Sequence, residues 1–245
     1  MEKKIRFETT SFSLHIMAML FMLCDHLWGT IVPGSDWLTC IGRLSFPIFA
    51  FMIVEGYFHT KNLRKYVKRL LVFAVLSEIP FDLAMGSRIF YPIHQNVLWS
   101  FLISIGLIHW NEKVKEKQVW KRVFVVIASV CIGYIGGLIT FVDFYNAGIL
   151  TVLVFYYFRN KKWWCYAAQL VCLWYINFEL LGGYSYEVQM FGETHFIARQ
   201  GIAVLALIPI WLYQGKQGYH SSGWQYFCYA FYPLHLLILG ILKWF

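Results

Sequence analysis

The chain has 245 residues, of which 59% are hydrophobic, 20% aromatic and only 14% charged, and its formal net charge is +8. A soluble domain is about 45–50% apolar and about 25% charged, so this chain lacks the charge to cover a water-exposed surface, whereas a lipid-covered surface needs none. The composition excludes an ordinary soluble domain and predicts one integral membrane domain over residues 1–245, in contact with a lipid bilayer.

The positive charge does not indicate a nucleic-acid partner. Lys and Arg occur in short runs between apolar stretches, which is typical of the loops of membrane proteins. The six Cys residues form no CxxC pair and no metal-ligand spacing, and most lie within apolar segments, where a free Cys behaves as a small hydrophobic residue. We therefore expect no nucleic acid and no metal site.

Nine stretches are candidates for membrane-spanning helices, which need about 20 mostly apolar residues. In chain order they are residues 13–31, 38–57, 70–85, 95–110, 123–141, 148–158, 163–181, 200–213 and 224–242. Several are short or contain Pro or charge, so we expect tilted, broken or partly inserted helices among them. The predicted fold class is all-α, a polytopic membrane bundle of about nine transmembrane helices.

The distribution of positive charge predicts the orientation. If the N-terminus is cytoplasmic, the inner segments hold 17 of the 21 Lys and Arg residues, and three lie outside: Arg88, Arg199 and Lys243. Cytoplasmic loops carry such an excess of positive charge. The expected topology is therefore N-terminus inside and C-terminus outside, with residues 182–199 as the largest outside loop.

Ionisable residues within membrane spans are expensive and are candidates for a functional site. With this topology most of them gather in the outer half of the bilayer, supplied by five helices. The candidate catalytic residues are Asp25, His26, Arg43, Glu78, Asp82, His94 and Asn96, and Asp143 stands at a segment end on the same side.

These candidates also have structural interpretations. Asp25 and Arg43 can form an ion pair between two helices. Glu78 and Asp82 share a helix face at i, i+4, but Pro80 lies between them. The two carboxylates can handle protons, cap a broken helix or pair with Arg88.

Three further residues have equally plain alternatives. His94 and Asn96 begin a predicted helix and can simply cap it, and His235 is interpreted as a structural histidine of the bundle. A histidine close to carboxylates nevertheless suits proton transfer, because its ordinary pKa of about 6.5 is near physiological pH.

A basic stretch follows the second predicted span. His59, Arg64, Lys65 and Lys68 can merely set the topology, or they can bind a phosphate-bearing cofactor on the cytoplasmic side. The sequence contains no P-loop, GxGxxG, GxSxG or HExxH motif.

Several sequence motifs resemble the TraX family, which is named for the acetylase of a conjugative pilin. They are MLCDHLW (22–28), IGRLSFPIFAFMIVEGYFHTKNLRKYVKRLL (41–71), SEIPFDLA (77–84), HQNVLWSF (94–101), VDFYNAGIL (142–150) and FYPLHLLIL (231–239). They cover nearly the whole chain in order. The resemblance implies a multi-pass acetyltransferase of the inner (cytoplasmic) membrane that transfers acetyl from acetyl-CoA to the N-terminal amine of a membrane-inserted or exported peptide.

Under this hypothesis His26, or otherwise His94, is the general base, and Asp25 or Asp82 orients that histidine. Arg43 or Asn96 stabilises the oxyanion, and the basic stretch binds the ADP end of CoA.

Two alternative functions remain. Buried ionisable residues also suit a proton-coupled transporter or flippase. The chain can also be an assembly factor without catalytic activity.

Overall fold

The computed structural model describes residues 8–190 and 193–244, and most of these residues are helical. The helices are α1 (Ser11–Thr30), α2 (Asp36–Gly42), α3 (Ser45–His59), α4 (Leu63–Phe81), α5 (Val97–Val114), α6 (Val119–Ile139), α7 (Tyr145–Tyr157), α8 (Trp163–Tyr175), α9 (Leu207–Trp211) and α10 (Ser222–Trp244). Two π-helical segments, η1 (Asp82–Gly86) and η2 (Ile176–Leu180), extend α4 and α8, and the 3-10 helix η3 (Arg199–Ala206) leads into α9.

Each of the nine predicted segments overlaps a helix or a pair of consecutive helical segments. Four helical stretches are long and apolar enough to cross a membrane: Ser11–Thr30, Asp36–His59, Val119–Ile139 and Ser222–Trp244. Two shorter apolar helices are Tyr145–Tyr157 and Arg199–Trp211. The chain is thus a helical protein with four candidate membrane spans in its described part. Lys3, Lys4 and Arg6, which contribute to the predicted inner charge, lie outside the described residues.

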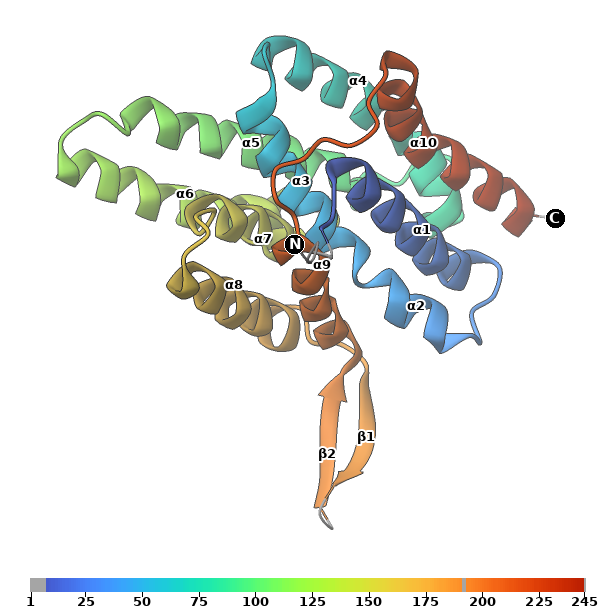
Figure 1. The fold of residues 1–245 in the computed structure, drawn as a ribbon. Coiled ribbons are helices and arrows are strands. Elements are labelled where there is room, and N and C mark those ends of the chain that lie inside the picture. Colours follow the sequence, from blue (N-terminus) through green and yellow to red (C-terminus); the bar gives the residue numbers. More distant parts are fainter. Residues whose placement is uncertain (1–7, 191–192, 245) are drawn as a thin grey trace, which may run out of the picture.

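The α3 helix forms the centre around which other helices pack. Its residues Ile48, Ala50 and Val54 have no exposed surface, and the helix contacts α1, α5, α7, η3 and α9 (Figure 1). The α6 helix, in contrast, exposes large apolar side chains such as Phe124, Ile127 and Ile135. An apolar surface of this kind suits contact with lipid.

Two helices are interrupted where they approach the polar residues of the predicted site. The predicted span 38–57 is broken at Arg43 and Leu44, between α2 and α3. Pro80 lies inside α4, which gives way to the π-helix η1 at Asp82. Proline removes a backbone donor, and π-helical turns often occur at functional sites. Irregular backbone in a membrane protein is tolerated where protein buries it or a cavity adjoins it.

An antiparallel hairpin of β1 (Ser185–Met190) and β2 (Glu193–Ala198) stands away from the helices (Figure 1). The sequence predicted only a loop over residues 182–199. Aromatic and β-branched residues alternate with polar ones in YEVQ, and three of the four residues of THFI are aromatic or β-branched, which is a strand signal. The hairpin joins η2 to η3, and its base reaches the site described below.

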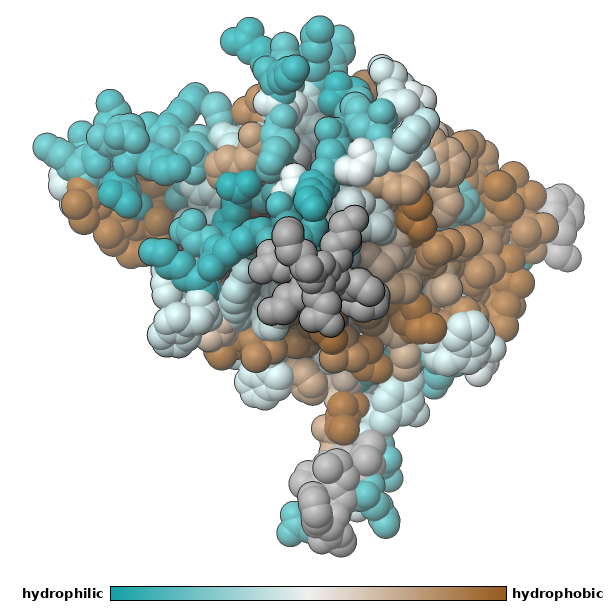
Figure 2. Space-filling model, in the orientation of Figure 1, coloured by the Kyte–Doolittle hydropathy of each residue, from teal (hydrophilic) through white to brown (hydrophobic). Residues whose placement is uncertain are grey.

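The surface separates hydrophilic from apolar regions. Hydrophilic residues gather where α4 begins and where α5 turns into α6, on the side opposite the hairpin, and much of the visible remainder is apolar (Figure 2). This distribution places many charged loops on one side of the helices.

Candidate functional site

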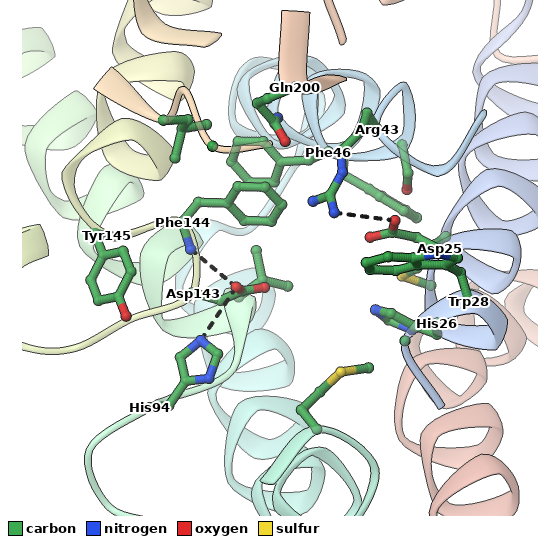
Figure 3. A pocket seen from close by; sticks show the side chains of 18 of the residues that line it. Asp25, His26, Trp28, Arg43, Phe46, His94, Asp143, Phe144, Tyr145 and Gln200 are labelled. Atoms are coloured by element: carbon green, nitrogen blue, oxygen red, sulfur yellow. Dashed lines mark hydrogen bonds and ion pairs between the residues drawn. The ribbon is translucent and has the colours of Figure 1, made fainter. Parts of the chain in front are cut away.

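A cavity of about 460 Å³ opens among α1, the α2–α3 break, the loop before α5, the start of α7 and the base of the hairpin. We call it the first cavity. It brings together four of the residues proposed from the sequence: Asp25, His26, Arg43 and His94. Asp25 and His26 lie on one side of the view in Figure 3, and His94 lies on the other. Its walls are otherwise mainly aromatic and aliphatic.

Asp25 and Arg43 form an ion pair, as one interpretation of the sequence expected. The distance from Arg43 Nη2 to Asp25 Oδ1 is 3.7 Å, and Thr39 Oγ1 donates a hydrogen bond of 2.7 Å to the same oxygen. Gly42 makes this contact possible, since a Cβ atom there would lie 2.7 Å from the Asp25 Cα atom. The ion pair therefore lies at a close approach of α1 and α2.

His26 contacts a second histidine rather than a carboxylate. His26 Nδ1 lies 2.6 Å from His235 Nε2, and His235 Nδ1 lies 2.6 Å from the Phe231 carbonyl oxygen. The rings are nearly parallel, at 6°, with centroids 4.9 Å apart. Such a short N···N distance between parallel rings is the geometry of an in-plane hydrogen bond.

These contacts determine where the protons lie on the two neutral rings. A carbonyl oxygen only accepts, so His235 Nδ1 carries a proton and donates it to Phe231. His235 Nε2 is then an acceptor, and His26 Nδ1 must be the donor. The free lone pair of His26 is consequently on Nε2, the ring nitrogen left for a substrate in the first cavity.

His94 belongs to the loop before α5 and pairs with Asp143. His94 Nε2 lies 3.5 Å from Asp143 Oδ1 (Figure 3). The hydrogen bond with Asp143 raises the pKa of His94 above its ordinary value of 6.5, although burial opposes the change. Backbone hydrogen bonds from Gln95 to Phe141 and from Asp143 to Gln95, both 2.8 Å, hold the two loops together.

The hairpin base adds a second cation to the first cavity. The guanidinium carbon of Arg199 lies 4.5 Å from the ring centroid of Trp28 and 5.2 Å from that of Tyr184. Its Nη1 atom is 3.5 Å from Asp36 Oδ1. Cation–π contacts of this kind fix the arginine in place.

The other three proposed catalytic residues do not line the first cavity: Asn96 caps α5, whereas Glu78 and Asp82 accept hydrogen bonds from residues that follow α4. Asn96 has no exposed surface, accepts from the Leu98 N–H as the N-cap of α5 and donates to Glu78. Glu78 also accepts from Trp99 Nε1 at 2.5 Å. Asp82 Oδ2 accepts from the Tyr91 N–H at 2.7 Å. These groups hold the α4–α5 connection in shape.

The proposed cofactor-binding residues separate into two groups. Arg64, Lys65 and Lys68 are exposed on α4 and line neither cavity. His59 lines a second cavity of about 280 Å³ at the other end of α3. In the part of the chain that the structure describes, no group of three potential metal ligands occurs.

Sequence reasoning missed the partners of the two histidines. His235 was interpreted as a structural histidine, and it has a backbone partner in Phe231, but its bond to His26, 209 positions away along the chain, was not predicted. Asp143 was noted only for its position at a segment end, and Arg199 only as an outside charge. All three are ionisable residues in or next to apolar segments, which is a signal for a functional site. No sequence motif or fixed spacing, however, pairs them with His26 or His94.

Comparison with known proteins agrees with the sequence motifs. Residues 11–243 match the family described as "TraX protein". A relative from Dichelobacter nodosus, described as "Probable fimbrial assembly protein FimC, serogroup H1", is 27% identical over 255 residues, covering 96% of each chain. No solved structure matches the chain. Since the family match covers nearly the entire length, this helical membrane protein belongs to the TraX family.

Proposed function

We propose that the protein is an acetyltransferase that moves acetyl from acetyl-CoA to an amine at the first cavity. The acceptor is the N-terminus of a pilin-like or other exported peptide. The observation that carries the proposal is the hydrogen-bonded pair of His26 and His235, because it leaves a basic nitrogen, His26 Nε2, at the cavity. The name of the TraX family and that of the fimbrial relative support a pilus-related substrate.

In the proposed reaction, the neutral acceptor amine attacks the carbonyl carbon of the thioester. A C–N bond forms and the C–S bond breaks, while His26 Nε2 takes the proton from the amine and returns it to the departing CoA sulfur. Arg43 stabilises the negative charge that develops on the carbonyl oxygen. Acetylated amine and free CoA thiol leave, so atoms and charges balance.

In this mechanism Asp25 positions Arg43 and does not orient His26. The reason is that Asp25 forms its ion pair with Arg43. His94, paired with Asp143, is the second candidate base on the far wall. Pairing with a carboxylate favours the protonated form of this histidine, which makes it a better proton donor than a base at neutral pH.

The proposed topology has about nine spans, with the N-terminus in the cytoplasm. Its support is the charge bias of the loops and the hydrophilic side opposite the hairpin (Figure 2). In a Cys-free variant, single Cys residues replacing Lys65 and Lys117 should react with an impermeant reagent only from the cytoplasmic side. A Cys replacing Ser185 should react from outside. Labelling of position 65 from outside would refute the topology.

The proposed function predicts an acetyl group on a small membrane or exported peptide. Intact-mass measurement of such peptides from cells with and without the gene should show an acetyl increment that depends on the gene. The fimbrial relative's name also fits an assembly factor without catalytic activity. That alternative predicts identical peptide masses and a defect in assembly alone, an outcome that contradicts the acetyltransferase proposal.

A further inference from the structure

The second cavity lies where α3 ends and α7 turns into α8. Its lining includes Glu55 and His59 from α3, Arg159 and Lys161 from the turn, and Trp211 from α9. Three of these five side chains are potential cations. Polar and apolar groups contribute about equally to its lining, whereas the walls of the first cavity are mainly apolar.

The two permanent cations keep donors available for a ligand. Arg159 uses Nε in its 2.7 Å bond to Glu55, and its guanidinium carbon lies 4.3 Å from the Phe58 ring centroid. With respect to residues 8–190 and 193–244, this arrangement leaves the two terminal amino groups of the guanidinium for an anion. Lys161 Nζ donates to the Tyr213 carbonyl and to Gln214 Oε1, each at 3.0 Å, which leaves one of its three N–H groups.

Aromatic rings adjoin these cations. Trp211 and Tyr166 both line the second cavity, with ring centroids 5.3 Å apart. Trp211 Nε1 donates at 2.7 Å to Gln169, whose Nε2 donates at 2.8 Å to the Phe158 carbonyl, so the indole is held in place. A fixed aromatic ring next to cations offers both stacking for a purine and hydrogen bonds for its phosphates.

Two elements run from one cavity to the other. Phe46 and Phe49 of α3 line the first cavity, and Phe51 and Glu55 line the second. Phe46 and Glu55 are about 13.5 Å apart along the helix at 1.5 Å per residue. Gln200, in η3, lines the first cavity and Trp211 lines the second. The cavities therefore lie at opposite ends of a seam between α3 and the η3–α9 segment.

The seam contains small side chains and an unusual helix. Ala50, Ala203 and Ala206 along it have no exposed surface. The 3-10 helix η3 has eight residues, whereas runs longer than three or four are uncommon. Alanine side chains at these three positions fill less of the seam than larger apolar side chains would.

We propose that the second cavity binds the adenine-nucleotide end of the acyl-CoA donor. Its phosphates contact Arg159 and Lys161, its adenine stacks on Trp211, and its flexible arm follows the seam to present the thioester in the first cavity. The inference rests on the proposed acetyl transfer and assigns the donor's binding site. It moves the phosphate contacts from Arg64, Lys65 and Lys68 of α4 to the α7–α8 turn.

The test measures binding of CoA, ADP and adenosine to purified full-length protein in detergent, by ligand-induced thermal stabilisation and equilibrium dialysis. One variant combines Glu55→Gln with Arg159→Gln, which removes the guanidinium without leaving Glu55 unpaired and keeps the net charge. The other is Lys161→Gln. Each should weaken CoA and ADP binding about 10- to 100-fold, the usual effect of losing a hydrogen bond to a charged group, and change adenosine binding little.

Matched variants separate this site from general electrostatic attraction. Lys113→Gln with Lys117→Gln removes two exposed cations from the end of α5 and the turn that follows it, and should leave CoA affinity near wild type in high salt, where exposed charges are screened. Loss of CoA affinity in Arg64→Gln with Lys68→Gln, but not in the second-cavity variants, would overturn the inference in favour of α4. If wild-type protein binds no CoA at all, the proposed donor is wrong, and the inference is wrong with it.

Discussion

The His26→Ala variant should lose acetyl transfer by about 10²–10⁴-fold, the usual contribution of a general base, while CoA binding and membrane insertion stay near wild type. The reason is that His26 Nε2 is the unprotonated ring nitrogen at the first cavity, and no part of His26 lines the second cavity. The measurement is single-turnover acetylation of an acceptor peptide, with protein abundance and CoA affinity determined in parallel.

His235 provides the matched comparison for His26. Because its Nε2 accepts the His26 Nδ1 proton, His235→Ala should reduce the rate without altering CoA affinity, and His235→Gln, which retains an acceptor, should restore part of it. A purely structural histidine would instead lower protein yield and leave specific activity unchanged. If His26→Ala retains wild-type specific activity, the assignment of the base is wrong and His94 is the next candidate.

Gly42→Ala should destabilise the protein by about 1–3 kcal/mol, the usual cost of inserting a methyl group into a packed contact. The added Cβ atom would lie 2.7 Å from the Asp25 Cα atom. This neighbour is backbone, so α1 and α2 must separate, and the Asp25–Arg43 pair and the adjacent His26 must shift with them. The expected result is a lower melting temperature in detergent together with a lower turnover rate.

Gly106→Ala is the control for this substitution. Gly106 lies in the interior of α5, and a Cβ atom added there would have no neighbour within 4 Å among the described residues. The change should leave stability unchanged or raise it, since alanine favours the helix by about 1 kcal/mol.

A Gly42→Ala protein that melts at the wild-type temperature would show that α1 and α2 can separate at no cost. The close approach at Asp25 would then not be required for the fold.

The sequence by itself determined the helical class and the positions of the helices. Apolar stretches and the charges between them can be read from the local sequence. In a membrane protein they indicate where the helices lie, because lipid requires every span to be apolar and internally hydrogen-bonded. For the same reason, residues such as His26 and Arg43 stood out within predicted spans. The hairpin at Ser185–Ala198 was missed because its strands lie outside the apolar stretches.

Only the tertiary structure decided what the polar residues contact. Glu78 carries the same kind of group as Asp25, yet its carboxylate accepts from Asn96, the N-cap of α5, whereas Asp25 lines the first cavity. The partner of His26 lies 209 positions away, on the last helix. Hydropathy and local spacing cannot pair such residues, because the rotation and packing of each helix about its axis, set by contacts with all its neighbours, determine which side chain enters the cavity.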